Sequence, residues 1–367
     1  MSWILAFVGF ALLVILHELG HFWAAKAVGM RVEKFSLFFP PTIARRKWGE
    51  TEYAIGAIPA GGYVKISGMN PDEDLPDEVR TRAYYSQPVW KRIVVIAAGP
   101  AMNLLLAFVL LLGFFALIGP TTETRRVGVI EKGYPAAGAL RPGDKLVAVD
   151  GRRGTPLELS RRIGNHKCAE TPPREGCEAA TPATVTVRRD GRERTFELTP
   201  IFDPAAPTDD PDNPGRTRLG FGYAEGPRDP LPFGEAFDLT ADRFWFITKA
   251  TLELPARLVD PEQRREISGV VGSYEVTRQT ILNDLAEVVG ILAIISLSLA
   301  IVNLFPFLPL DGGHIFWAIV EKVRGRPVAF SVMERAGVVG FMLVILIFLV
   351  GLSNDIDRLS GEGFQVP

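Results

Sequence analysis

The sequence predicts a polytopic α-helical membrane protein with four transmembrane helices, a membrane-associated β-hairpin and an extracytoplasmic α+β domain. Apolar residues make up 47% of the 367 residues, yet 22% are charged, and the two populations separate along the chain. Crossing a bilayer requires about 20 apolar residues. Four stretches are candidates, although the last is short: Trp3–Val28, Ile93–Ile118, Val288–Leu310 and Ala336–Leu352. A polar segment of domain size separates the second stretch from the third.

The first apolar stretch carries a motif that suggests a metal site. No charged or strongly polar side chain occurs from Trp3 to Leu16, and then His17, Glu18 and His21 follow closely. Ionisable groups are costly in hydrocarbon and by default mark a functional site. His17 and His21 stand at i and i+4 on one helical face and can bind one metal ion, with Glu18 beside them as general base. The alternative is a buried, hydrogen-bonded His/Glu cluster without metal.

The basic residues near the segment ends predict the orientation of the helices. They gather after the first stretch, before the second, and between the third and fourth: Arg31, Lys34, Arg45, Arg46, Lys47, Lys91, Arg92, Lys322, Arg324, Arg326 and Arg335. By the positive-inside rule both termini and the polar domain lie outside, and the motif lies toward the cytoplasmic half of the first helix. A cleaved signal peptide is disfavoured, because the stretch lacks a basic beginning and runs directly into the motif.

The end of the third stretch offers a third metal ligand. A catalytic zinc site has three protein ligands and one open position. Asp311 closes an apolar span without a basic partner nearby, and two prolines break the helix around it. Such irregular backbone is tolerated at membrane depth only where it lines a cavity or is buried in protein. Zn²⁺, Asp311 and Glu18 together sum to zero charge, which lowers the cost of burying them. The sequence leaves open two alternatives, namely His314 as the ligand and a helix-capping role for Asp311.

The polar segment has the pattern of a small β domain. Val127–Ile130 is a short β-like run, and Ala139–Gly151 combines a Pro-Gly-Asp turn with an alternating strand. Asp190-Gly191 lies between two strand-like runs and predicts a hairpin. The segment resembles a PDZ domain over residues 126–202. PDZ domains pair a peptide with a sheet edge, so contact with a peptide or substrate domain is one expected role, and a spacer or size filter is the alternative.

The remaining boundaries follow from these elements. Residues 1–125 are expected to hold the first two membrane helices and the hairpin, residues 203–287 a linker and amphipathic juxtamembrane helices, and residues 288–367 the last two membrane helices. Cys168 and Cys177, the only cysteines, lie in the domain expected outside, where disulfides persist. We expect them to be paired, and two free thiols are the alternative.

Several motifs, in the same order, resemble the site-2 protease family of intramembrane zinc metalloproteases, and most closely its regulator-of-sigma-E protease branch. The motifs are HELGHFWAAKAVGM (17–30), AIPAGGYVKISG (57–68), VWKRIVVIAAGPAMN (89–103), ISGVVG (267–272) and NLFPFLPLDGGH (303–314). The resemblance implies His17, His21 and Asp311 as zinc ligands and Glu18 as catalytic base. It also implies that Asn303 helps to hold substrate near the metal. One departure is Pro309, which stands one position later than in many relatives.

The segment Glu52–Ile66 looks like a β-hairpin that turns at Pro59–Gly62. In the family the matching segment dips into the membrane beside the active site. A free edge there could pair with unwound substrate as an added strand. Gly61, Gly62 and Tyr63 are therefore expected to position the substrate, and a surface hairpin without substrate contact is the alternative.

The resulting prediction is a zinc metalloendopeptidase of the bacterial plasma membrane. It would cleave transmembrane segments of pre-trimmed single-span proteins, such as anti-sigma factors or signal-peptide remnants. The expected cofactor is Zn²⁺ and the expected partners are transmembrane substrates and the lipid bilayer, since no basic patch suggests nucleic acid. A non-enzymatic adaptor would not need Glu18, and a metal transporter would need more polar residues along several helices.

Overall fold

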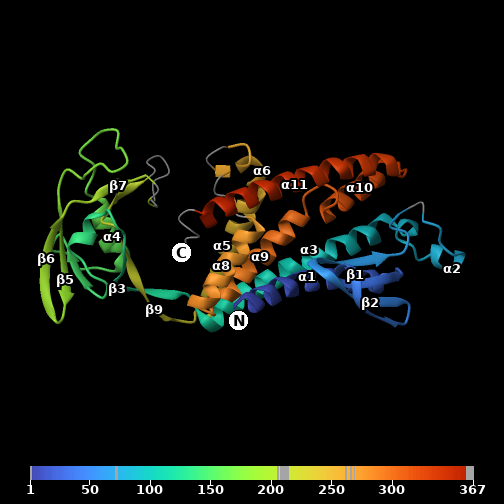
Figure 1. The fold of residues 1–367 in the computed structure, drawn as a ribbon, viewed down its shortest axis with the longest axis horizontal. Coiled ribbons are helices and arrows are strands. Elements are labelled where there is room, and N and C mark those ends of the chain that lie inside the picture. The colour runs from blue at the N-terminus through green and yellow to red at the C-terminus, as the bar shows by residue number, and fades with distance from the viewer. Residues whose placement is uncertain are drawn as a thin grey trace. The chain divides into compact units, whose positions relative to one another are not determined.

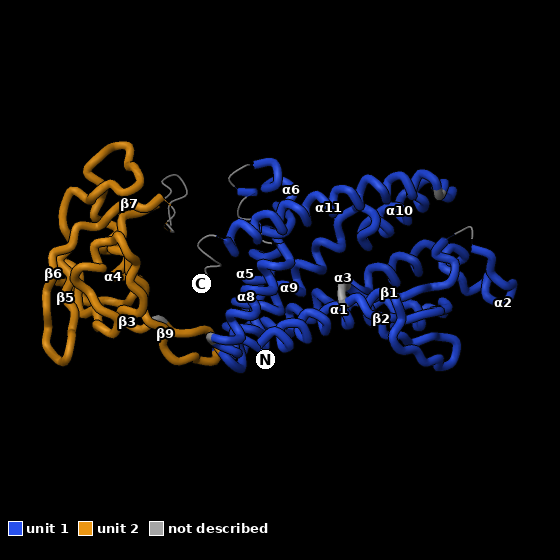
Figure 2. The backbone as a smooth tube through the Cα atoms, in the orientation of Figure 1, with its two compact units in different colours: residues 1–118, 231–367 blue, residues 119–230 orange. Residues whose placement is uncertain are grey.

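The computed structural model describes residues 2–70, 73–204, 206, 215–260, 263–264, 267 and 269–360. The chain divides into two compact units (Figure 2). Unit 1 consists of Met1–Ile118 and Leu231–Pro367, and unit 2 consists of Gly119–Pro230. The two units are described separately below.

Long apolar helices build unit 1 (Figure 1). Within the described residues, three helical segments are long and apolar enough to cross a membrane: Ser2–Ala27, Val89–Ile118 and Ser331–Ser360. They correspond to α1 (Ser2–Ala27), to α3 (Val89–Gly113) with a π-helical turn after it, and to α11 (Phe330–Ser360). The prediction of a short last span is wrong, because α11 has 31 residues.

The third predicted span is shorter than the sequence suggests. Its helix, α9, covers Glu287–Asn303 and has 17 residues. It does not continue to Leu310, because Pro306 and Pro309 follow closely. A proline lacks the N–H that the helix ladder needs and disfavours helical backbone in the residue before it. The next helix, α10 (Asp311–Arg324), begins directly after this irregular segment.

The remaining helices of unit 1 are short or amphipathic. They are α2 (Asp77–Arg80), α5 (Phe233–Leu252), α6 (Leu254–Arg257) and α8 (Val270–Asn283). The core forms where helices meet: Ala107 of α3 packs with Leu297 and Ile301 of α9. A partly buried ion pair joins α3 to α10, in which Arg92 donates to both oxygens of Glu321 at 2.9 and 2.5 Å.

The β structure of unit 1 differs from the predicted hairpin. It consists of β1 (Val32–Trp48) and β2 (Thr51–Ile66), which pair antiparallel. Ser36 of β1 pairs with both Ala54 and Tyr63 of β2. The first part of β1 therefore lies between the two halves of β2, and residues 53–57 do not pair with residues 63–66 as expected. The alternating pattern indicated strands correctly, but it carries no information on which strand is the neighbour.

This arrangement defines which strand segments are edges. Residues 51–55 are central, since Ile55 pairs with both Leu37 and Ala44. Residues 62–66 pair only with β1 among the described residues. They form a sheet edge, which is called the 62–66 edge below.

Unit 2 contains a five-stranded antiparallel sheet in the order β6-β5-β4-β3-β9. The strands are β3 (Thr121–Ile130), β4 (Lys145–Val149), β5 (Ala183–Arg189), β6 (Arg192–Leu198) and β9 (Phe221–Arg228). One helix, α4 (Pro156–Gly164), contributes Leu159 and Ile163 to the core. A small second sheet pairs β7 (Ile201–Asp203) with β8 (Arg216–Arg218). The unit thus extends beyond residues 126–202, because β9 lies where the sequence indicates only linker and helix.

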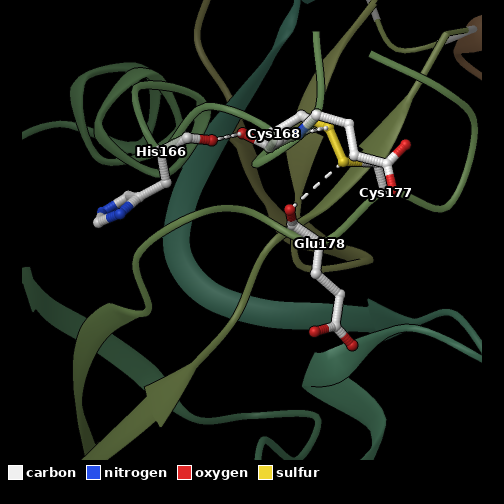
Figure 3. The surroundings of a disulfide bond; sticks show 6 residues. His166, Cys168, Cys177 and Glu178 are labelled. Carbon is white, nitrogen blue, oxygen red and sulfur yellow. Dashed lines mark hydrogen bonds between the residues drawn. A yellow bond between two sulfur atoms is a disulfide. The ribbon is translucent and has the colours of Figure 1, made fainter.

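Two local predictions in unit 2 are confirmed. β5 and β6 form a hairpin, and both turn residues have positive φ, at 51° for Asp190 and 78° for Gly191. This is the backbone of a type I′ turn, which matches the twist of paired strands. Cys168 and Cys177 form a disulfide with their Cα atoms 5.8 Å apart, at the base of a loop (Figure 3).

Candidate metal centre and active site

Helix α1 presents two imidazoles to one point in the interior of unit 1. His17 and His21 are 7% and 8% exposed, and their Nε2 atoms lie 3.2 Å apart. One helical turn separates the two residues, so the same face of α1 carries both. Glu18 follows His17 and lines the cavity that both histidines reach.

Helix α10 supplies the third group from far along the chain. Asp311 is its first residue, and its Oδ2 lies 3.2 Å from Nε2 of His17 and 3.4 Å from Nε2 of His21. Ligand atoms of these three residues all lie within 4.8 Å of one another. An acidic side chain in the first turn also suits the positive end of the helix dipole.

The spacing of these atoms fits a zinc ion. Zinc binds nitrogen and oxygen ligands at about 2.0–2.2 Å in a tetrahedron. The edge of a tetrahedron is about 1.6 times the centre-to-corner distance, which gives about 3.3–3.5 Å between ligands. The three separations of 3.2, 3.2 and 3.4 Å match this value closely. Oδ2 of Asp311 is buried without a hydrogen-bond donor among the described residues, as expected of an atom that faces a cation.

Helix α3 orients the second histidine. Nδ1 of His21 lies 2.9 Å from the carbonyl oxygen of Val95 and donates to it in the tautomer that leaves Nε2 free. Gly99 lies against the same ring, where a Cβ atom would overlap Nε2 of His21. Neither contact was predicted as part of the site. The only signal in the sequence is a glycine within an apolar helix, which commonly marks close helix packing.

Glycines also allow the loop before Asp311 to fold tightly. A Cβ atom at Gly312 would overlap the carbonyl of Leu304, and one at Gly313 would overlap the backbone of Leu308. Gly340 of α11 admits the carbonyl of Leu308 in the same way. The Arg92–Glu321 pair then fixes α10 against α3, and Arg92 is only 4% exposed. These contacts hold Asp311 opposite the histidines.

The predicted site residues line one cavity of about 400 Å³. Its walls combine groups from α1, β2, α9 and α10: His17, Glu18, His21, Gly61, Gly62, Tyr63, Val64, Asn303, Asp311 and His314 are among them. His314 thus lines the cavity, but it does not belong to the cluster of converging ligand atoms. Phe39 and Pro309 also line it and had no predicted role.

The 62–66 edge packs directly against the expected general base. A Cβ atom at Gly62 would lie 3.0 Å from Cγ of Glu18. Val64 and Glu18 both line the cavity. The same strand segment therefore forms a cavity wall and packs against Glu18.

The site combines two imidazoles and a carboxylate at zinc-ligand spacing with a glutamate beside them, all within a bundle of apolar helices. This combination is typical of a membrane metallopeptidase. Comparison with known proteins agrees, since the sequence model of peptidase family M50 matches residues 5–347. The chain belongs to this family, the site-2 proteases, and is a zinc metalloprotease.

Two relatives illustrate the similarity. The regulator of sigma-E protease RseP of Escherichia coli is 28% identical and covers 96% of this chain and 97% of its own length. The zinc metalloprotease Rip1 of Mycobacterium tuberculosis is 30% identical and covers 92% of this chain and 91% of its own length. The predicted resemblance, enzyme class and cofactor are confirmed by these matches.

Proposed function

We propose that the cavity of unit 1 is the active site of an intramembrane protease, with His17, His21 and Asp311 as zinc ligands and Glu18 as general base. The observation that carries this proposal is the convergence of three ligand atoms at separations of 3.2–3.4 Å beside the Glu18 carboxylate. A structural zinc site would have no need of an adjacent base.

The chemistry divides between the metal and the protein. Zinc in such a site polarises a carbonyl as a Lewis acid and makes water more acidic. Glu18 accepts a proton from the attacking water and returns it to the leaving amide nitrogen. The close wall at Gly62 keeps the carboxylate in place for both transfers.

The substrate has to enter in an extended form. In a helix the scissile carbonyl is hydrogen-bonded and shielded by side chains, so an unwound segment is needed. Among the described residues the 62–66 edge pairs only with β1, and Gly62, Tyr63 and Val64 line the cavity, so this edge can pair with such a segment as an added strand. Gly61, Gly62 and Tyr63 would position the strand, and Asn303, the last residue of α9, would hold it from the opposite side.

We propose single-span membrane proteins, trimmed beforehand outside the membrane, as the substrate class, with anti-sigma-factor-like proteins or signal-peptide remnants as examples. One relative is named for the regulation of sigma-E, which supports this class. In this proposal α9 is the fourth membrane span, the protein resides in the bacterial plasma membrane, and both termini and unit 2 are extracytoplasmic. Unit 2 would act as a PDZ-like domain that contacts substrate or limits its size.

The decisive experiment compares Glu18→Gln with the wild-type protein in reconstituted vesicles that contain a single-span model substrate. We expect Glu18→Gln to keep about one zinc per chain and to lose cleavage entirely, because only the proton transfer is removed. Cleavage at the wild-type rate would contradict the role of Glu18 and would favour the adaptor alternative.

A further inference from the structure

The two histidines of the metal centre are held unequally. Both direct Nε2 toward Asp311, so Nδ1 carries the proton in each when a metal is bound. Nδ1 of His21 donates to the Val95 carbonyl. Nδ1 of His17 is buried and has no hydrogen-bond partner among the described residues. Metal-ligating histidines almost always donate this second N–H to an acceptor. We therefore expect an acceptor near Nδ1 of His17.

The packing of α1 against α3 indicates where an acceptor lies. Three contacts show that the helices run antiparallel: Lys91 Nζ donates to the Val28 carbonyl, His21 contacts Val95, and Gly20 packs on Ala98. One turn backward along α1 therefore corresponds to one turn forward along α3. His21 lies against Gly99. Since one helical turn separates His17 from His21 and Asn103 from Gly99, we expect His17 to lie near the level of Asn103.

Asn103 has a side chain that matches this need. It is 0% exposed, and neither its amide oxygen nor its amide nitrogen has a hydrogen-bond partner among the described residues. Only its backbone carbonyl is engaged, by the hydroxyl of Ser296 at 3.0 Å. A primary amide buried in a membrane helix is costly unless it is hydrogen-bonded. Thus the helix pair contains a buried donor without an acceptor and a buried amide without partners among the described residues, and helix periodicity places the two at about the same level.

We propose that Asn103 is a positioning residue for the metal centre. Its Oδ1 accepts the Nδ1–H of His17 in the zinc-bound protein, through one ordered water or after a rotation of the amide side chain, and thereby fixes the ring orientation and the tautomer that presents Nε2 to zinc. Asn103 then accepts from His17 as the Val95 carbonyl accepts from His21. The two acceptor residues lie one helical turn on either side of Gly99. The proposal rests on the proposed role of His17 as a zinc ligand and adds its outer partner.

The test compares two nearly isosteric substitutions in the full-length protein. Asn103→Leu removes the acceptor, whereas Asn103→Asp keeps an oxygen that can accept from His17. Zinc affinity is measured by chelator competition, and the coordination geometry by the visible absorption of the cobalt-substituted protein. We expect Asn103→Leu to weaken zinc binding by about 10–100-fold and to change the cobalt bands, as loss of an outer partner does. Asn103→Asp should retain affinity within a few-fold.

Ser296→Ala is the matched control, because it removes a buried hydrogen bond to the same residue without touching its side chain. It should leave zinc affinity and the cobalt spectrum unchanged. Equal losses in Asn103→Leu and Asn103→Asp, or a loss in Asn103→Leu no greater than in Ser296→Ala, would overturn the proposal. His17→Ala distinguishes failure of the ligand assignment from failure of the role of Asn103. Zinc retained in His17→Ala refutes the ligand assignment. Zinc lost in His17→Ala but kept in Asn103→Leu refutes only the role of Asn103.

Discussion

The residues of the proposed centre differ in how far the sequence alone predicts their role. His17, Glu18 and His21 could be picked out as site candidates, because the i, i+4 spacing puts the two histidines on one helical face and ionisable groups are costly in a membrane. Gly99 could not be predicted as part of the site. Its importance comes from the approach of α3 to the His21 ring, and a tertiary contact of this kind has no local pattern.

The close packing at Gly99 predicts that a larger residue there weakens zinc binding and lowers stability. In Gly99→Ala the new methyl group would overlap the His21 imidazole and displace it. We expect zinc affinity to fall by tenfold or more and stability to fall by about 1–3 kcal/mol, which is typical of overpacking. Gly113→Ala in the same helix is the control, since nothing lies within 4 Å of its added Cβ. Metal titration and thermal unfolding provide the measurements, and wild-type affinity in Gly99→Ala would refute the argument.

The choice between Asp311 and His314 is also testable residue by residue. Asp311→Ala should lose bound zinc, because two imidazoles alone leave the ion with too few protein ligands. His314→Ala should keep about one zinc per chain. Metal content by mass spectrometry decides between them. Zinc kept by Asp311→Ala and lost by His314→Ala would reverse the assignment.

Among the elements, β1 and β2 show the limit of pattern reading. The alternation over Glu52–Ile66 predicts strand correctly, but the neighbour of each half is β1, because residues 34–37 lie between the two halves. Strand propensity is local, whereas pairing depends on which segments the chain brings together. The end of α9 could be anticipated from Pro306 and Pro309, although the length of the apolar run suggested a longer helix.

The edge position of residues 62–66 predicts how proline substitutions act. Val64→Pro removes a backbone N–H from the 62–66 edge and blocks strand addition there, so cleavage should fall strongly while zinc stays bound. Helix-destabilising residues in the substrate span should restore part of the activity. Ile43→Pro, on the opposite side of the sheet, is the control and should leave most cleavage intact. Ile55→Pro would be uninformative, because Ile55 is central and its loss of pairing disturbs the whole sheet. Full activity of Val64→Pro would exclude strand addition at this edge.

The turn between β1 and β2 predicts a dependence of stability on pH. Glu50 accepts from Arg82 at 2.8 and 2.9 Å and from Lys26 at 2.6 Å, and these cations lower the pKa of its carboxyl to about 2. A lowered pKa in the folded state stabilises the fold above the ordinary value of 4.5, and the contribution disappears as pH falls from there toward about 2. Because these groups are partly exposed, we expect about 1 kcal/mol or less.

Thermal unfolding of Glu50→Gln and wild-type protein across this range measures that contribution. The difference between them should be constant near neutrality and should vanish at the acid end. A difference that grows as the pH falls would contradict the assignment.

For the whole molecule, the sequence predicts the class well and the boundaries less well. Apolar runs and a polar insertion indicate a membrane protein with a β-rich unit, since composition alone separates the two. The fifth strand of unit 2, β9, could not be predicted, because Phe221–Arg228 contains two glycines and a proline and lacks a regular alternation.

The disulfide of unit 2 offers a test at this scale. Protein denatured without reductant should show no thiol that reacts with a labelling reagent, and reduction should expose two. Cys168→Ser with Cys177→Ser should lower the stability of unit 2 by about 2–3 kcal/mol, as expected for a short closed loop. Two reactive thiols before reduction would contradict the pairing and weaken the proposed extracytoplasmic location, where disulfides persist.

The distribution of the three converging groups along the chain has a consequence for biosynthesis. His17 and His21 leave the ribosome before unit 2, whereas Asp311 emerges only after unit 2 and most of the helices. With Asp311 as the proposed third ligand, a nascent or prematurely terminated polypeptide would not complete the centre before Asp311 has been translated and inserted. If Asp311 is the third ligand, as proposed, the protease therefore cannot act on neighbouring proteins at the translocation machinery, or on its own unfinished chain, before Asp311 is in place.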